Sequence, residues 1–286
     1  MKRYVIYSAM VGGYDEILQP KVVDDRFDFV LFTNEIMEDA VGVWKIKPIK
    51  YYNKDNTRVC RYVKTHPTEL LNDYEVSVWM DSNLQIQTSF FYEKVIELDL
   101  SGVLISSMKH PTRNCIYEEA FAVMNMRVEY ENVVVDWCHK LRNEKYPQNN
   151  GMYETGVMFR KHNACLVHKT GDLWWECINN YSRRDQLSFN YVIWKIGVPC
   201  TFFFGESKYA NNTEHLRLIQ HKDEKHNHCP LGKNEAWLMR HCWKDRTKTA
   251  EVEQIYYMLY SFPFPHFWIA LVGQYFRLLD DFRKNK

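Results

Sequence analysis

The chain has 286 residues, 46% of them hydrophobic and 15% aromatic, which is enough to bury the core of one large domain. Its 37 Lys and Arg residues nearly balance 36 Asp and Glu residues, so the formal net charge at pH 7 is +1. The composition gives no support to a nucleic-acid-binding protein, which would carry a basic surplus, or to an acidic solvating tail.

The first residues and the cysteines bear on where the protein works. Met1–Tyr7 is too short and too polar for a signal peptide and resembles the start of a first strand. The 8 Cys residues have no repeating spacing, so reduced thiols are favoured over a disulfide framework. We therefore expect a cytoplasmic protein.

Strand patterns alternate with helix patterns along most of the chain. We expect strands over 3–10, 29–33, 43–47, 76–81, 102–108, 153–159 and 200–204, and helices over 58–71, 90–98, 117–126, 129–142, 165–180 and 185–196. This alternation predicts an α/β fold with a largely parallel sheet that helices cover on both faces. From 205 to about 235 the chain is polar, as expected of a long functional loop.

The C-terminal part has a different character. Residues 255–276 are crowded with Tyr, Phe, Leu and Trp, but Pro263 and Pro265 interrupt the run and basic residues follow it. A bilayer span needs about 20 uninterrupted apolar residues, which this segment lacks. Two interpretations remain: packing on the domain or a second subunit, or contact with the inner face of a membrane. We divide the chain into a domain over 1–250 and a helical appendage over 251–286.

The predicted strand over 76–81 carries the strongest chemical signal. It ends in Asp81, and Ser82 and Asn83 follow. Ligands of α/β proteins bind at the carboxyl ends of strands, and residues two apart in extended backbone point the same way. Oxygen ligands from Asp81 and Asn83 suit Mg²⁺ or Mn²⁺, the ions that clamp diphosphates. The alternative is an ordinary turn, because all three residues favour turns.

Two other early segments are compatible with phosphate binding. Gly12 and Gly13 follow the first predicted strand, and glycines let the backbone approach a ligand closely. Arg58, Arg61 and Lys64 fall on one face of a predicted helix because they are three residues apart. That face either binds phosphates or is simply solvated.

Later segments place polar residues at predicted strand ends and helix starts. His110 and Arg113 follow a strand and precede a helix, where they can hold sugar hydroxyls. Glu154 begins a buried strand, which is an unusual place for a carboxylate without a partner. Asp185 and Gln186 open a helix, where they either point into a cleft or cap the helix.

The last candidates follow the long loop. His241 can complete a metal site, with Lys244 close by in sequence for a phosphate. A zinc site is the alternative. Its spacing fits no common zinc pattern, and its ligands would be His226, His228, Cys229, His241 and Cys242.

Taken together, these segments resemble a GT-A type glycosyltransferase-like family that was formerly catalogued as a domain of unknown function. Plant members are tied to seed mucilage and cell-wall traits, and relatives occur in bacterial polysaccharide loci. The similar segments run in order from about Tyr4 to Ile196: Gly12-Gly13-Tyr14-Asp15, Arg58 with Lys64-Thr65-His66-Pro67, Trp79-Met80-Asp81-Ser82-Asn83, His110 through Glu119, Glu154-Thr155-Gly156 and Arg184-Asp185-Gln186-Leu187-Ser188. The resemblance implies a Rossmann-like half that binds a nucleotide, a carboxylate-bound divalent metal and an acceptor half.

A more distant similarity concerns retaining transferases of the blood-group type. His110-Pro111 with Tyr117-Glu118, and Asp185-Gln186, are similar to their donor-site segments. The second acid of that pair is Gln186 here, which leaves the anomeric outcome open. In the metal motif Asn83 stands where a second acid is expected. The loss of one negative charge predicts weaker metal binding.

The sequence and the resemblance together predict a glycosyltransferase that moves a sugar from a nucleotide-diphosphate donor to a glycan or lipid-linked glycan, with Mn²⁺ or Mg²⁺. The alternatives are a non-catalytic nucleotide-sugar-binding protein and a nucleotidyltransferase. The expected metal ligands are Asp81, Asn83 and His241; the donor-binding residues are Gly13, Tyr14, Arg58, Lys64, His110, Arg113 and Lys244; the catalytic candidates are Asp185, Gln186 and Glu154.

Overall fold

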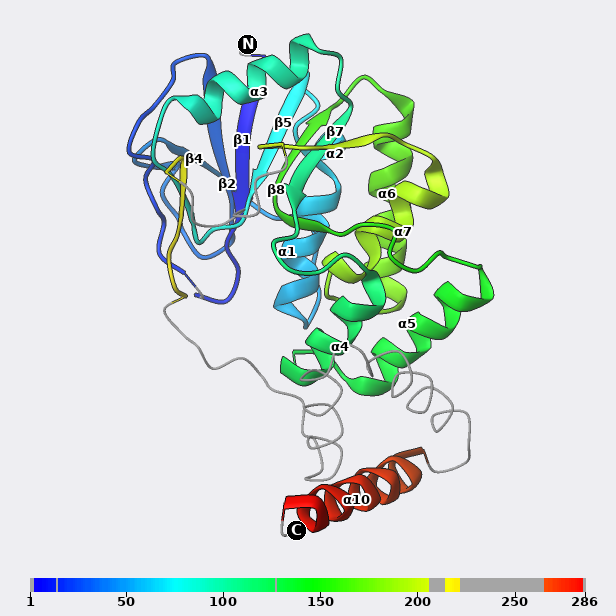
Figure 1. Cartoon of the computed structure of the whole chain (residues 1–286). Coiled ribbons are helices and arrows are strands. Elements are labelled where there is room, and N and C mark those ends of the chain that lie inside the picture. Colours follow the sequence, from blue (N-terminus) through cyan, green and yellow to red (C-terminus); the bar gives the residue numbers. More distant parts are fainter. Residues whose placement is uncertain (1–2, 14, 127, 206–213, 222–264, 285–286) are drawn as a thin grey trace. The chain divides into compact units, whose positions relative to one another are not determined.

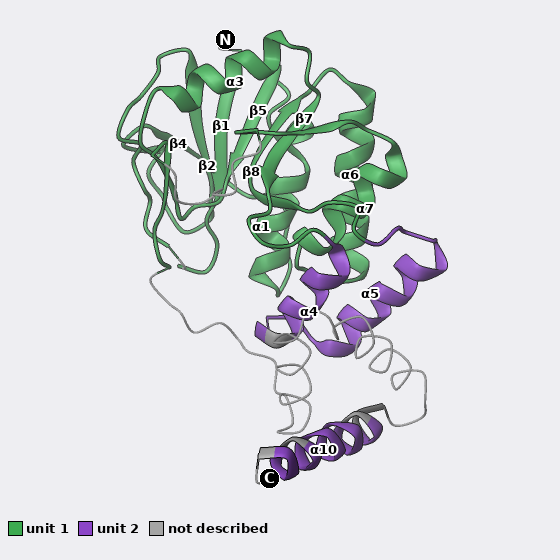
Figure 2. Ribbon diagram, in the orientation of Figure 1, with its two compact units in different colours: residues 1–114, 149–224 green, residues 115–148, 225–286 purple. Residues whose placement is uncertain are grey.

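A computed structural model describes residues 3–13, 15–126, 128–205, 214–221 and 265–284. The chain forms two compact units (Figure 2). The first comprises Met1–Asn114 and Asn149–Glu224, and the second comprises Cys115–Gln148 and Lys225–Lys286. The expected boundary at 250 and 251 lies outside the described residues.

The first unit is built on a mixed sheet (Figure 1). Its strands are β1 (Tyr4–Ala9), β2 (Phe27–Phe32), β3 (Ala40–Val41), β4 (Trp44–Lys47), β5 (Val76–Met80), β7 (Ile105–Lys109), β8 (Tyr153–Lys161) and β9 (Cys200–Phe202), in the order β3-β4-β2-β1-β5-β8-β7-β9. Strand β1 pairs in parallel with β2 and β5. Strand β8 runs antiparallel to β5 and β7 because the chain returns beside the end of β7, with Tyr153 paired to Lys109. The predicted α/β fold is confirmed.

Helices cover both faces of this sheet. Those of the first unit are α1 (Asn56–Thr65), α2 (Pro67–Leu70), α3 (Phe90–Leu100), α6 (Cys165–Asn180) and α7 (Gln186–Ile196). Side chains alternate between the faces of a strand. On β1, Ile6 therefore packs in the cluster with α3, whereas the Tyr7 hydroxyl donates a hydrogen bond to the Lys64 carbonyl of α1. Helix α6 packs on both α1 and α7.

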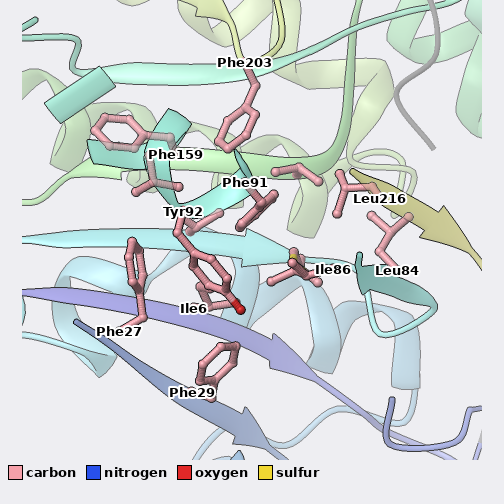
Figure 3. Packing of buried hydrophobic residues seen from close by; sticks show 14 of the residues in the cluster. Ile6, Phe27, Phe29, Leu84, Ile86, Phe91, Tyr92, Phe159, Phe203 and Leu216 are labelled. Carbon is pink, nitrogen blue, oxygen red and sulfur yellow. The ribbon is translucent and has the colours of Figure 1, made fainter. Parts of the chain in front are cut away.

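A hydrophobic cluster lies on the α3 face of the sheet. Figure 3 shows aromatic side chains of this cluster packed together, among them Phe29 of β2, Phe91 of α3 and Phe159 of β8. Phe27 and Tyr92 join them, and their ring centroids are 5.0 Å apart. Aromatic pairs at such distances add to the stability gained by burying their apolar surface. This core fixes β1 and β5, whose carboxyl ends carry the loops of the candidate site.

The second unit is helical in its described part. Its helices are α4 (Ile116–Met126), α5 (Glu131–Asn143) and α10 (Pro265–Lys284). In its described part helix α10 continues past residue 276, the end of the expected aromatic segment, to Lys284. Within the residues that the structure describes, no helix is long and apolar enough to cross a membrane.

Most expected elements are present, and the differences have local causes. The single helix expected over 58–71 is divided between α1 and α2 because His66 precedes Pro67, and a residue before proline avoids helical backbone angles. The short strands β3, β6 (Leu84–Ile86) and β10 (Leu216–Leu218) were not predicted. The last two form a separate antiparallel ribbon, and β10 lies in the segment expected to be a loop.

Asp99, the last acidic residue of α3, ties three elements together beside the amino end of β1. Its carboxylate accepts hydrogen bonds from Arg3 Nε at 2.8 Å and Tyr4 Oη at 2.9 Å, and lies 2.9 Å from Lys161 Nζ. Burial opposes ionisation of this carboxyl, but the hydrogen bonds from Arg3, Lys161 and Tyr4 outweigh it and lower the pKa to about 2. Ionised Asp99 therefore stabilises the fold.

We predict that Asp99→Asn lowers the free energy of unfolding by about 2 kcal/mol near neutral pH. The folded-state pKa lies below the ordinary value of 3.8, so this contribution is complete above that value and is lost as the pH falls towards 2. Urea unfolding of both proteins across this range measures the difference. Asp172→Asn, at an exposed position of α6, is the matched control. A difference that stays constant with pH would contradict the assignment.

Candidate active site

Asp81 lies directly after β5, at the carboxyl edge of the sheet. Its Oδ1 accepts a hydrogen bond from Trp79 Nε1 at 2.7 Å and lies 3.4 Å from Lys64 Nζ. No described residue donates a hydrogen bond to Oδ2, and 35% of the side chain is exposed. Asp81 is therefore held through one oxygen and presents the other to solvent.

Asn83 is connected to a histidine and a second carboxylate. Its Nδ2 lies 3.2 Å from His221 Nε2, and His221 Nδ1 lies 2.6 Å from Asp15 Oδ1. Asp15 also accepts a hydrogen bond from Ser82, and only 5% of its side chain is exposed. A carboxylate against Nδ1 favours the proton on that nitrogen, so Nε2 accepts the hydrogen bond from Asn83 Nδ2. Three loops thus meet at Asn83: those after β1, β5 and β10.

The glycine loop after β1 binds an internal carboxylate. The backbone N–H groups of Gly12 and Gly13 both donate hydrogen bonds to Glu35, that of Gly13 over 2.7 Å. Both glycines have positive φ angles, +86° and +61°, which other residues rarely adopt. The loop conformation therefore requires glycine and directs two adjacent N–H groups to one acid.

A small cavity lies beside Asp81. Its volume is about 10 Å³, room for a single water molecule. The walls come from β1, β2, β4 and the turn after β5, and they include Ser8, Glu16, Trp44, Asp81 and Ser82. The Ser8 hydroxyl is buried and finds no hydrogen-bond partner in the described part of the chain. A nucleobase does not fit this cavity unless its walls move.

The three cations of α1 have internal partners. Arg58 binds Asp55 at 2.8 Å and the Tyr181 carbonyl at 3.0 Å. Arg61 and Lys64 both contact Asp185, at 2.9 Å and 2.6 Å. The predicted common face is present, but it packs toward α6 and α7 rather than being a solvated basic face. Direct contact of Arg58 or Lys64 with a donor stays a prediction.

Asp185 precedes α7 and is buried. Its side chain makes no capping hydrogen bond, so helix capping does not explain the residue. Burial opposes ionisation, but the charges of Arg61 and Lys64 outweigh it and hold the carboxyl pKa far below its ordinary value. Gln186 is the first residue of α7 and is partly exposed. Asp185 is therefore bound by Arg61 and Lys64, whereas the Gln186 side chain is partly accessible.

His110 and Arg113 lie in the loop after β7, and Glu154 is the second residue of β8. His110 Nδ1 accepts hydrogen bonds from the backbone N–H groups of Thr112 and Arg113. Burial, with the charge of Arg113, lowers the pKa of His110 to about 4, so the ring is neutral at neutral pH. Glu154 is partly buried beside Thr155. Their roles at a donor stay predictions.

Some candidates lie outside the described residues, and others were missed. Tyr14, His241 and Lys244 fall outside, as do the histidines and cysteines of the zinc alternative. Asp15 and His221 were not predicted as a pair, and no local pattern could reveal a contact across 206 residues. The signal available was limited to the glycine motif around Asp15 and the polar composition of the loop near His221.

The described residues fit a loosely held divalent cation. They bring together no group of three or more His, Cys, Asp or Glu side chains suited to a metal. They do offer the open Oδ2 of Asp81 and the Asn83 amide oxygen, and His221 Nε2 lies 3.2 Å from the Nδ2 of the same amide. Mg²⁺ and Mn²⁺ are often held by one or two carboxylates, with waters and substrate phosphates completing the shell. The donor set suits such an ion.

The chain was compared with known proteins. A comparison with curated proteins finds no match. Among solved structures, the apo structure of the WbbM bifunctional glycosyltransferase is similar with a TM-score of 0.42 and 13% sequence identity, over 70% of this chain and 38% of that chain. A family model, the TOD1/MUCI70 glycosyltransferase-like domain, matches residues 1–217. Because that match covers most of the chain, the protein belongs to the TOD1/MUCI70 glycosyltransferase-like domain family.

Proposed function

We propose that the protein transfers a sugar from a nucleotide-diphosphate donor to a glycan or lipid-linked glycan acceptor, with a divalent metal ion. The family supports glycosyl transfer in general. The observation that carries the finer proposal is the open carboxylate oxygen of Asp81 beside the Asn83–His221–Asp15 chain of contacts. Ligands of α/β proteins bind at this edge of the sheet.

Asp81, Asn83 and His221 would hold Mn²⁺ or Mg²⁺ in this proposal. His221 replaces His241 as the described candidate, and Asp15 orients it as carboxylates orient metal-binding histidines. When bound, such an ion offsets the negative charge that develops on the leaving diphosphate. Trp79 holds Asp81 Oδ1, so the carboxylate keeps a fixed direction toward the ligand edge.

The reacting groups are assigned from how far each is already engaged. Gln186 is open and would hold a hydroxyl of the donor sugar. Glu154 is the better candidate for the base that accepts the acceptor hydroxyl's proton, because Asp185 is occupied by Arg61 and Lys64. A carboxylate whose pKa is far below the ordinary range is a weak base.

Helix α10 supports contact with a membrane surface. Its exposed large apolar side chains are Phe267, Trp268, Leu271, Tyr275, Leu278 and Phe282. An α-helix turns about 100° per residue, so these six fall within an arc of about 100° that extends for roughly 22 Å. Trp and Tyr favour the interface of a bilayer, and the basic surplus after residue 276 complements anionic lipid. An acceptor carried on a lipid would then lie in the same membrane surface that α10 contacts.

We predict that the protein with Mn²⁺ releases nucleoside diphosphate from a sugar nucleotide and that Asp81→Asn lowers this rate by about 10²-fold or more. The variant keeps the shape of the side chain and removes its charge, so the melting temperature should change little. Asp172→Asn is the control. Donor binding without turnover would favour the non-catalytic binder, and pyrophosphate release from triphosphates would favour the nucleotidyltransferase.

A second prediction concerns His221. His221→Phe should weaken Mn²⁺ binding, measured by electron paramagnetic resonance in the presence of a nucleoside diphosphate, by about 10-fold or more, because one nitrogen ligand is lost. Asp15→Asn should weaken it less, since the ligand stays and only its orientation is affected. Unchanged Mn²⁺ affinity in His221→Phe would remove this histidine from the metal site.

The membrane proposal is tested by flotation with vesicles that contain anionic lipid. Leu271→Glu should lower the bound fraction by about 10-fold or more, because a buried leucine contributes about 1.5–3 kcal/mol. Gln274→Glu adds the same charge next to the apolar arc and should have a smaller effect. If Leu271→Glu instead turns an oligomer into a monomer and leaves flotation unchanged, the face binds a second copy.

A further inference from the structure

The ammonium group of Lys64 is buried between two carboxylates. The residue is 1% exposed, and Nζ lies 2.6 Å from Asp185 Oδ2 and 3.4 Å from Asp81 Oδ1. The rings of Trp79 and Trp174 flank it, with centroids at 5.3 Å and 5.9 Å. A buried lysine is unfavourable unless it is paired, so the two acids are what make this position tolerable.

The backbone of Lys64 is fixed as well. Its carbonyl accepts hydrogen bonds from Arg160 Nη1 at 2.6 Å and from Tyr7 Oη at 3.0 Å. This carbonyl belongs to the last turn of α1, where helix carbonyls lack partners within the helix. Strands β1 and β8 therefore hold the root of the side chain, while the acids hold its tip.

Asp185 has no oxygen left for a substrate. Oδ1 faces Arg61 Nε at 2.9 Å, and Oδ2 contacts Lys64 and accepts a hydrogen bond from Thr155 Oγ1 at 2.9 Å. Only 5% of the side chain is exposed. Its contact with the ligand edge of the sheet runs through Lys64 to Asp81.

We infer that Asp185 is a positioning residue that acts through Lys64 on Asp81. By holding the ammonium group at 2.6 Å, Asp185 keeps Lys64 from closing fully on Asp81, where the separation is 3.4 Å. Asp81 thereby keeps more of its negative charge for Oδ2, the oxygen that Lys64 does not contact. This inference rests on the proposed function only where it assigns a cation to that oxygen; the geometry of Asp81 itself can be measured without one.

Substitutions of Asp185 and of Lys64 are expected to have opposite effects on cation binding. In Asp185→Asn, Lys64 loses its strongest partner and shifts toward Asp81, so the Mn²⁺ dissociation constant should rise by about 10-fold. In Lys64→Met, the competing charge is removed and the dissociation constant should fall. The double variant should resemble Lys64→Met more than Asp185→Asn, because the shift of the ammonium group needs Lys64. If the ion pair is purely structural, both single variants should be less stable. Their Mn²⁺ dissociation constants should then not change in opposite directions.

The indole N–H of Trp79 supplies a readout that needs no metal. It donates to Asp81 Oδ1 at 2.7 Å, so its nuclear magnetic resonance shift reports the position of that carboxylate. Trp79→Phe assigns the signal. Asp185→Asn and Lys64→Met should both move it, and the exposed Asp172→Asn should not.

These outcomes separate the inference from the proposed function. Wild-type protein that neither binds Mn²⁺ nor turns over donor would overturn the proposed function. The Trp79 resonance would still show whether Asp185 acts through Lys64 on Asp81. A resonance that stays unchanged in both single variants would overturn the inference, whatever the activity. If Asp185→Asn fails to fold, Lys64→Met carries both measurements, and a weaker Mn²⁺ affinity in that variant would also contradict the inference.

Discussion

The candidate site depends on the burial of one lysine, Lys64. A charged group removed from water needs several partners at short range. For Lys64 these come from different parts of the chain: Asp185 before α7, Thr155 on β8, Asp81 after β5 and two tryptophan rings. Satisfying this charge therefore fixes helices α1 and α7 against two central strands, and it does so next to the edge where a ligand would bind.

Strand β8 links this cluster to the opposite edge of the sheet. Thr155 contacts the side chain of Lys64, and Arg160 donates a hydrogen bond to its carbonyl. Lys161, at the end of the strand, pairs with Asp99. The strand is antiparallel to both of its neighbours, β5 and β7, and its nine residues run from the one cluster to the other. Three residues of one strand thus connect the stability of the sheet to the geometry of the candidate site.

The sequence allowed the fold to be predicted well and the site only in part, and the reason is physical. Helix α6 was predicted with its observed bounds, because hydrophobic periodicity is a local signal. The position of Asp81 after a buried strand was equally local. Partner choice is not: the spacing of Arg61 and Lys64 indicated a common face, but nothing nearby in sequence revealed that Asp185 would occupy it. The Asp15–His221 contact depends on the path of the whole chain.

The charges at Asp81 suggest why a cation and a diphosphate would bind together. Asn83 contributes an amide where a second acid would add negative charge, and Lys64 already neutralises part of Asp81. A divalent ion alone would therefore face a site with little net negative charge in its described part. A diphosphate supplies the missing charge and further oxygen ligands, so each would raise the affinity of the other. By holding Lys64 back from Asp81, Asp185 would set how much of that negative charge the protein itself retains.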